Sequence, residues 1–449
     1  MATKPSPSKD LRRQLGLFAV TSIVVANMIG VGIFTTSGLL MGDLKDPWIM
    51  LLLWFVGGCL AFLGALSYGE LGAAMPMAGG EYAFLSRLFS PLTGFLSGWV
   101  SFMVGFSAPI AASAMGFSEY ILNAYPLLPE WVGLSVTAFN KLLAIGVILI
   151  FSWIHSRGLS LGASIQNVLT LLKVVLIVGM IALGFFFGSG DPSHFTVVAS
   201  TDFEPVGFKT YGLALMWIMF AYSGWNAATY IGSEIRNPVK NLPTSLFMGT
   251  GIVIILYLLL NALFVYAVPP NEMAGVIAIG GLTVERLFGG TANIVISLMI
   301  AFALFSSLSA FIIIGPRVYY AMAKDGLFFG FVGRMHKKHN VPANAIGIQA
   351  LIATILVLSG TFDQILTFMG FALGIFPILA VYGVFRLRKQ QRSAKRFPGY
   401  PWTQLIFISA SIFILILAFM ERPLESSVAI GTVLIGIPIY YLFKKKDAG

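Results

Sequence analysis

The amino-acid sequence predicts an all-α integral membrane protein with twelve transmembrane helices. Hydrophobic residues make up 57% of the 449 residues and charged residues only 10%. Many apolar runs reach the roughly 20 residues that a helix needs to cross a bilayer. Because these runs are continuous and do not alternate with polar residues, they do not predict an outer-membrane β-barrel.

The predicted spans follow one another with short loops, so no soluble domain is expected between them. The twelve spans are 15–40, 48–74, 82–122, 135–155, 162–187, 210–235, 244–268, 291–322, 344–360, 362–386, 402–420 and 426–443. Spans one to five and six to ten are expected to form two halves of inverted topology, with the last two helices peripheral. The predicted regions are a cytoplasmic tail (1–14), the first repeat (15–187), an extracellular loop (188–209), the inverted repeat (210–386), and a cytoplasmic loop, two helices and a tail (387–449).

Membrane topology, rather than nucleic-acid binding, explains the net charge of +10. With the N-terminus inside, most Lys and Arg fall in inner segments. The outer segments hold only Lys45, Lys141, Lys209, Arg286 and Arg422. The positive-inside rule then predicts that both termini lie in the cytoplasm. The expected location is the plasma membrane, and no nucleic-acid partner is expected.

Two membrane segments half a chain apart carry glycines and small polar residues where a lipid-facing helix favours Leu and Phe. They are 27–34 (NMIGVGIF) and 220–226 (FAYSGWN). Each glycine weakens a helix by about 1 kcal/mol relative to alanine. Matched weak points in the two halves predict that helices 1 and 6 are broken around a midplane site for a small solute.

The backbone groups freed at such breaks suit a zwitterionic amino acid. The N–H groups of Val31 and Gly32 are expected to bind its carboxylate, and the carbonyls of Met28, Phe220 and Ser223 its ammonium. Phe220 could also act as an aromatic gate, or serve only in packing, and the glycines could serve only close helix contact. The predicted substrate-binding residues are Met28, Ile29, Gly30, Val31, Gly32, Phe220, Ala221, Tyr222, Ser223, Gly224 and Asn226.

Lys173 lies near the centre of the fifth span, where a lysine costs roughly 2.5–3.5 kcal/mol on insertion scales. Its expected partners are the carbonyls of Ala26 and Ile29 and the hydroxyl of Ser306 or Ser307. There it would replace a sodium ion, either as a fixed latch or as the carrier of a transported proton. The alternative is a lysine solvated by an inner cavity.

The acidic residues favour a neutral substrate, because none lies in the middle of a predicted core helix. They stand near span ends or in loops, at Asp43, Asp46, Glu70, Glu81, Glu119, Asp363 and Glu421. A cationic amino acid or a polyamine would need a buried counter-charge. Neutral side chains are therefore favoured, with a cationic amino acid or polyamine carrier as the alternative.

No enzyme, metal site or cofactor is predicted. The four histidines all fall outside the predicted core, and His336 and His339 stand in a basic loop without an acidic neighbour. The single cysteine, Cys59, cannot form an internal disulfide and is expected to be a small packing residue. A channel, or a nutrient sensor that binds without transport, remains a possible alternative.

Four motifs resemble those of the amino acid–polyamine–organocation superfamily. Residues 28–34 (MIGVGIF) resemble its first-helix motif M-I-G-[ST]-G-I-F, and residues 220–226 (FAYSGWN) its sixth-helix motif. Residues 234–243 (EIRNPVKNLP) are similar to the loop after that helix. Residues 315–326 (GPRVYYAMAKDG) resemble the end of its eighth helix.

The resemblance implies the LeuT-like five-plus-five inverted repeat and transport by alternating access. The residues Trp225-Asn226 and Asn237-Pro238 resemble the L-type and alanine/serine/cysteine exchanger branch. A lysine at the position of Lys173 implies sodium independence. Cationic-selective relatives carry a Glu in the third helix, where this chain has Val104 and Gly105, so the resemblance also favours neutral substrates.

The chain differs from the family in the first-helix motif and from its animal members in the loop after helix three. Val31 replaces the usual Ser or Thr of the first-helix motif and removes a hydroxyl near the carboxylate site. Animal exchangers of this branch attach to a single-span partner through a Cys between helices three and four. Segment 123–134 has no Cys, so no disulfide-linked partner is expected.

Overall fold

The computed structural model describes residues 13–157, 159–196, 207–336, 339, 341–359, 362–391 and 395–446. In these ranges the chain is helical, and the only β-type contacts are two isolated bridges, Leu15–Ile235 and Ala78–Ile231. Among the described residues, ten helices are long and apolar enough to cross a membrane, and two shorter apolar helices complete the set of twelve. The predicted all-α membrane fold is confirmed.

The first five spans contain both continuous and interrupted helices. Span one is divided into α1 (Leu17–Met28) and α2 (Val31–Leu44). Span two is α3 (Pro47–Ala74), and span three joins α5 (Pro91–Val100), the π-helical η1 (Ser101–Gly105) and α6 (Ser107–Ala124). Spans four and five are α8 (Val136–Ser156) and α9 (Leu159–Phe187).

The sixth span is the second interrupted one. It consists of α10 (Phe208–Ala221) followed by the short 3₁₀ segments η3 (Ala227–Tyr230) and η4 (Gly232–Glu234). The remaining spans are α11 (Pro238–Ala267), α14 (Gly290–Lys324), α15 (Ala343–Ser359), α16 (Phe362–Lys389), α17 (Trp402–Glu421) and α18 (Pro423–Lys446). Short connecting helices are α4 (Glu81–Leu88), α7 (Leu128–Val132), η2 (Pro192–Phe195), α12 (Pro270–Met273) and α13 (Ile279–Phe288).

The third span differs from the continuous helix predicted over 82–122. The first helix ends at Leu88, and Ser90 is extended because the residue before a proline is disfavoured in the α region; Pro91 then starts a new helix. Ser90 caps that helix by accepting a hydrogen bond from the Thr93 N–H at 3.1 Å. The π-helical turn η1 comes just before Pro109, which lacks the N–H that a regular helix would need.

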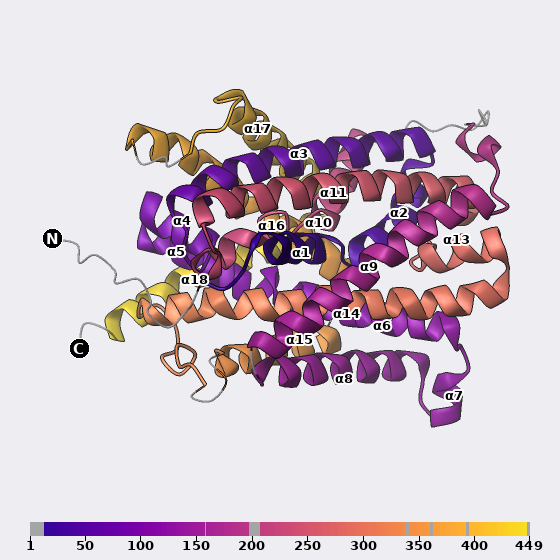
Figure 1. Cartoon of the computed structure of the whole chain (residues 1–449), viewed down its shortest axis with the longest axis horizontal. Coiled ribbons are helices and arrows are strands. Elements are labelled where there is room, and N and C mark those ends of the chain that lie inside the picture. The colour runs from indigo at the N-terminus through magenta and orange to yellow at the C-terminus, as the bar shows by residue number, and fades with distance from the viewer. Residues whose placement is uncertain are drawn as a thin grey trace.

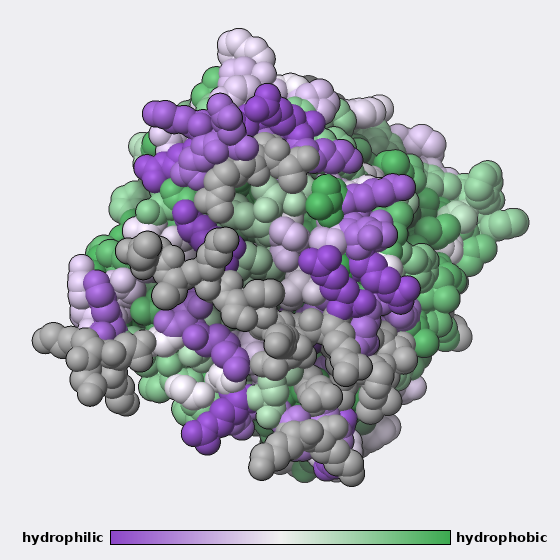
Figure 2. Space-filling view, turned by 60° about the vertical axis from the view of Figure 1, so that its left-hand side comes forward, coloured by the Kyte–Doolittle hydropathy of each residue, from purple (hydrophilic) through white to green (hydrophobic). Residues whose placement is uncertain are grey.

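The long helices run side by side along the molecule (Figure 1). We call the end with α4 and the last residues of α18 the terminal end, and the end with α7 and α13 the far end. Large apolar side chains on the flanks are exposed, as at Leu172 (59%) and Phe186 (82%). Figure 2 shows hydrophilic residues gathered on the terminal end and hydrophobic residues along the flanks, as a bilayer requires. Cys59 lies on the exposed surface of α3, so the packing role predicted for it is wrong.

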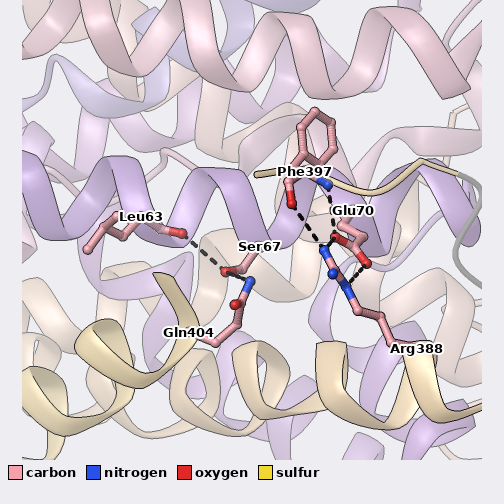
Figure 3. A network of polar contacts seen from close by, with 6 residues as sticks. All are labelled: Leu63, Ser67, Glu70, Arg388, Phe397 and Gln404. Carbon is pink, nitrogen blue, oxygen red and sulfur yellow. Dashed lines mark hydrogen bonds and ion pairs between the residues drawn. The ribbon is translucent and has the colours of Figure 1, made fainter. Parts of the chain in front are cut away.

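A buried polar network fastens α3 to α16 and α17 near the terminal end (Figure 3). Arg388 donates two hydrogen bonds of 2.7 Å to the two oxygens of Glu70, whose exposure is 1%. The Phe397 N–H donates to the same carboxylate at 3.3 Å. One turn along α3, Gln404 donates to the Ser67 hydroxyl at 3.3 Å. We call the Glu70–Arg388 pair the terminal clamp.

Candidate functional site

The first helix break spans two residues. Ile29 (φ −74°, ψ 91°) and Gly30 (φ −122°, ψ −160°) are both extended, and α2 begins at Val31. No side chain caps the start of α2. The first N–H groups of any helix lack partners within that helix, so those of α2 are available to an anion.

The second break follows Ala221. Gly224 has φ +99°, a conformation that side-chain-bearing residues rarely adopt, and the chain does not return to an α-helix until Pro238. A Cβ atom on Gly224 would lie 2.7 Å from the carbonyl carbon of Asn27. A Cβ atom on Gly32 would lie 2.8 Å from the Cα of Ala221. The two breaks therefore touch each other, and glycine is required at both contacts.

Tyr257 of α11 joins the two breaks. Its hydroxyl lies 2.6 Å from the Met28 carbonyl oxygen and 3.1 Å from that of Ala221, and it can donate to either. The Met28 carbonyl predicted for the substrate ammonium thus already accepts one hydrogen bond, although it has a second lone pair. The sequence did not single out Tyr257, because a tyrosine within an apolar span is typical of packing.

Lys173 of α9 is buried beside the first break, with 1% of its surface exposed. Its ammonium donates to the Ala26 carbonyl at 3.2 Å, to the Ser307 hydroxyl at 2.8 Å and to the Ile29 carbonyl. Ser307 also donates to the Ile29 carbonyl at 2.7 Å. The predicted contacts with Ala26, Ile29 and Ser307 are present. Because all three ammonium protons meet protein acceptors, the alternative of a cavity-solvated lysine is not supported.

The second serine proposed for Lys173 has a different neighbour. The Ser306 hydroxyl lies 3.2 Å from that of Thr170, one turn before Lys173 on α9. Ile29 contributes its carbonyl to the lysine and does not line either cavity described below. The lysine group therefore sits behind the first break rather than in contact with a substrate.

Two cavities meet at the breaks. The smaller has an empty volume of about 250 Å³ and the larger about 1040 Å³, and both volumes include open solvent at the mouth. The smaller is lined by Asn27, Met28, Gly30, Val31, Gly32, Pro109, Ser113, Phe220, Ala221, Ser223 and Phe311. The larger shares Asn27, Phe220, Ser223 and Phe311 and adds residues of α5, α16 and α17 together with Gly224 and Asn226.

Phe220, the predicted gate, lines the cavities, whereas Tyr222, a predicted substrate contact, does not. Phe220 lines both cavities with only 6% exposure, where an aromatic gate would stand. Tyr222 lines neither cavity. Its hydroxyl donates to the Trp54 carbonyl at 3.2 Å and its ring packs against Trp54 and Tyr257. The predicted substrate contact of Tyr222 is thus not supported, because the turn after Ala221 directs its side chain toward α3.

Glu81 lies near the start of the third span, as predicted, but its burial was not predicted. It has 6% exposure and lines the larger cavity, so the core does contain a carboxylate. Tyr68 donates to its Oε1 at 2.7 Å and Asn226 at 2.8 Å. Burial raises the pKa of the Glu81 carboxyl, and hydrogen bonds from these neighbours partly offset that rise. The signal in the sequence was the pair Gly79-Gly80, whose positive φ values fold α4 back toward the protein.

Comparison with known proteins gives the family. Residues 15–443 match the amino acid permease family. The chain belongs to this family. Its place in the L-type-like branch of the amino acid–polyamine–organocation superfamily agrees with the four motifs. Membership of this superfamily implies the five-plus-five inverted repeat with broken helices 1 and 6.

Several curated transporters resemble this permease over nearly its whole length. The serine/threonine exchanger SteT of Bacillus subtilis is 29% identical, covering 98% of each chain. The b(0,+)-type amino acid transporter 1 of Mus musculus is 27% identical, covering 97% of this chain and 88% of its own. The human Asc-type amino acid transporter 1 is 26% identical, covering 96% and 82%.

Proposed function

We propose that this permease is a sodium-independent secondary transporter of neutral L-amino acids, working by alternating access through exchange or proton coupling. The observation that carries the proposal is the contact between the two helix breaks at a cavity. Similar relatives named for serine/threonine, b(0,+)-type and Asc-type amino acid transport support amino acids as the substrate class. The family is a transporter family, and we assign the chain no enzymatic turnover.

Backbone groups would bind the parts common to all amino acids. The substrate carboxylate would accept from the N–H groups of Val31 and Gly32 at the positive end of α2. Its ammonium would donate to free lone pairs of the Met28, Phe220 and Ser223 carbonyls. Because Val31 takes the place of a hydroxyl residue, the carboxylate would rely on the backbone alone at that position.

Lys173 supports sodium independence. Its ammonium ties the carbonyls of Ala26 and Ile29 to Ser307 of α14, which is what a bound cation between a broken helix and its scaffold would do. A fixed positive charge there would repel sodium from the same position. Lys173 would serve as a latch in an exchanger, or as the proton carrier in a symporter.

We place this permease in the plasma membrane with its terminal end in the cytoplasm. The basic residues of that end, including Arg87, Arg157 and Lys324, support this orientation through the positive-inside rule. The far end carries few basic residues, such as Lys45 and Lys141. We propose no disulfide-linked partner, because Cys59 lies within a transmembrane helix.

Counterflow in proteoliposomes tests the function. Vesicles loaded with one neutral amino acid should accumulate a labelled second one, equally with and without sodium. Running the assay with and without a pH gradient separates exchange from proton coupling. A requirement for sodium, or uptake in which arginine outcompetes both alanine and leucine, would contradict the proposal.

A further inference from the structure

The larger cavity has a polar end that the helix breaks do not account for. Most of its lining is apolar, but Glu81, Ser97 and Asn226 come together where it approaches the terminal end. Glu81 begins α4, Ser97 lies on α5, and Asn226 follows the second break. Three separate elements thus place polar atoms around one part of the cavity.

Ser97 lacks a partner in this group. Its exposure is 1%. Ser97 and Glu81 line the same cavity, and the hydroxyl has no hydrogen-bond partner among the described residues. Buried polar groups are normally satisfied, so a hydroxyl of this kind beside a cavity indicates a missing ligand group.

Glu81 has acceptor capacity to spare. An ionised carboxylate offers about four lone-pair positions. The hydrogen bonds from Tyr68 and Asn226 both end on Oε1, and Tyr230 faces the same carboxyl. No Lys or Arg in the described ranges forms an ion pair with it. A further donor could therefore bind Glu81 without displacing those present.

We infer that Glu81 and Ser97 form a subsite for the substrate side chain that favours neutral amino acids carrying a hydroxyl or carboxamide. Such groups can donate to the Glu81 carboxylate and at the same time accept from the Ser97 hydroxyl. An aliphatic side chain leaves both unpaired, which is how a polar site rejects an apolar isostere. A cationic group can only donate hydrogen bonds, so it offers no acceptor for the Ser97 hydroxyl proton. This inference rests on the proposed function and deepens it.

Isosteric substrates provide the test. Threonine and valine differ by a hydroxyl in place of a methyl, and asparagine and leucine are similar in shape. Competition against counterflow in proteoliposomes gives the ratio of apparent affinities within each pair. In Ser97→Ala the threonine-to-valine ratio should fall about 2- to 12-fold, the range of one net hydrogen bond. In Glu81→Gln it should fall about tenfold or more, because hydrogen bonds to charged groups are stronger.

A matched control removes another buried, unpartnered hydroxyl. Ser152 of α8 makes no hydrogen bond to any described residue and lines neither cavity, so Ser152→Ala should leave both ratios unchanged. Thermal unfolding in detergent confirms that each variant is folded; should Glu81→Gln fail to fold, Ser97→Ala decides. Ratios that stay constant in Ser97→Ala, or affinities for threonine and valine that fall equally, would overturn the subsite. Absence of transport of every amino acid by the unmodified permease would instead overturn the proposed function.

Discussion

A single buried ammonium defines the environment of the first break. Lys173 donates to two backbone carbonyls at the interrupted helix and to one hydroxyl of α14. The sequence alone identified this residue and most of its partners, because a mid-membrane lysine is costly and needs acceptors. Its role in the transport cycle stays a prediction.

Replacing Lys173 with alanine should impair transport more than folding. We expect the cost of one unpaired buried acceptor, about 1–3 kcal/mol, to fall on the latched state of the transport cycle, so exchange should fall roughly 5- to 150-fold. Substrate binding should survive, because Lys173 lines neither cavity. Flux and equilibrium binding measured side by side check this. The control is Leu172→Ala, at a lipid-exposed position of the same helix. Unchanged flux in Lys173→Ala would show that the lysine is only structural.

Because Glu81 is buried, we expect the folding stability of the permease to depend on pH. Since burial raises the pKa of the Glu81 carboxyl, the native state binds this proton more tightly than the unfolded chain does. Stability is therefore highest when both states are protonated, below about pH 4, and falls as the pH rises toward the native pKa. Glu81→Gln stays neutral and should lose this contribution. The test is to measure the unfolding temperatures of the unmodified permease and of Glu81→Gln at pH 5 and at pH 8. The unfolding temperature of Glu81→Gln relative to the unmodified permease should be higher at pH 8 than at pH 5. An identical difference at both pH values would contradict the prediction.

At the scale of helices, sequence reasoning found the breaks but not what they contact. Gly32 and Gly224 are weak helix formers in apolar spans, and that local signal was sufficient. The role of Tyr257 depends on α11 passing beside both breaks, which no local pattern encodes. The burial of Glu81 was missed for the same reason: its position near a span end was predicted, but its contact with the cavity depends on how the turn at Gly79-Gly80 packs α4 against the protein.

The two glycines of the first break should differ in their tolerance of a methyl group. A Cβ on Gly32 meets Ala221 at 2.8 Å, whereas on Gly30 the nearest atom, the Ser307 hydroxyl oxygen, is 3.7 Å away. Gly32→Ala should force the breaks apart at a cost of about 1–3 kcal/mol, and uptake should fall accordingly. Gly30→Ala has the same added volume and should keep most of the uptake. Initial uptake rates at matched protein amounts measure both. Equal losses would mean that the close approach of the breaks is unimportant.

At the scale of the whole molecule, composition and charge placement were enough to predict a twelve-helix membrane protein. They could not predict which distant helices are joined by polar contacts. Glu70 and Arg388 lie 318 positions apart, and nothing in the sequence around either residue identifies the other. Such contacts depend on tertiary packing, which a single sequence does not reveal.

The terminal clamp should therefore contribute to the stability of the whole helix bundle. Breaking a buried ion pair by removing one partner leaves an uncompensated charge, at a cost of about 3–5 kcal/mol. Arg388→Ala removes the two hydrogen bonds that Arg388 donates to the buried Glu70 carboxylate and should lower the unfolding free energy, by up to this amount. The double variant Glu70→Gln/Arg388→Ala should recover part of the loss, because no charge remains buried.

The same protein provides an exposed pair for comparison. Glu272 and Arg286 approach to 2.5 Å at the far end, with side-chain exposures of 40% and 51%. Solvent screening limits pairs of this kind to about 0–1 kcal/mol, so Arg286→Ala should leave the unfolding temperature nearly unchanged. Thermal unfolding of all variants in one detergent gives both results together. If the two arginine variants lose equal stability, or if the double variant is no more stable than Arg388→Ala, the clamp does not hold α3 to α16 in the way described.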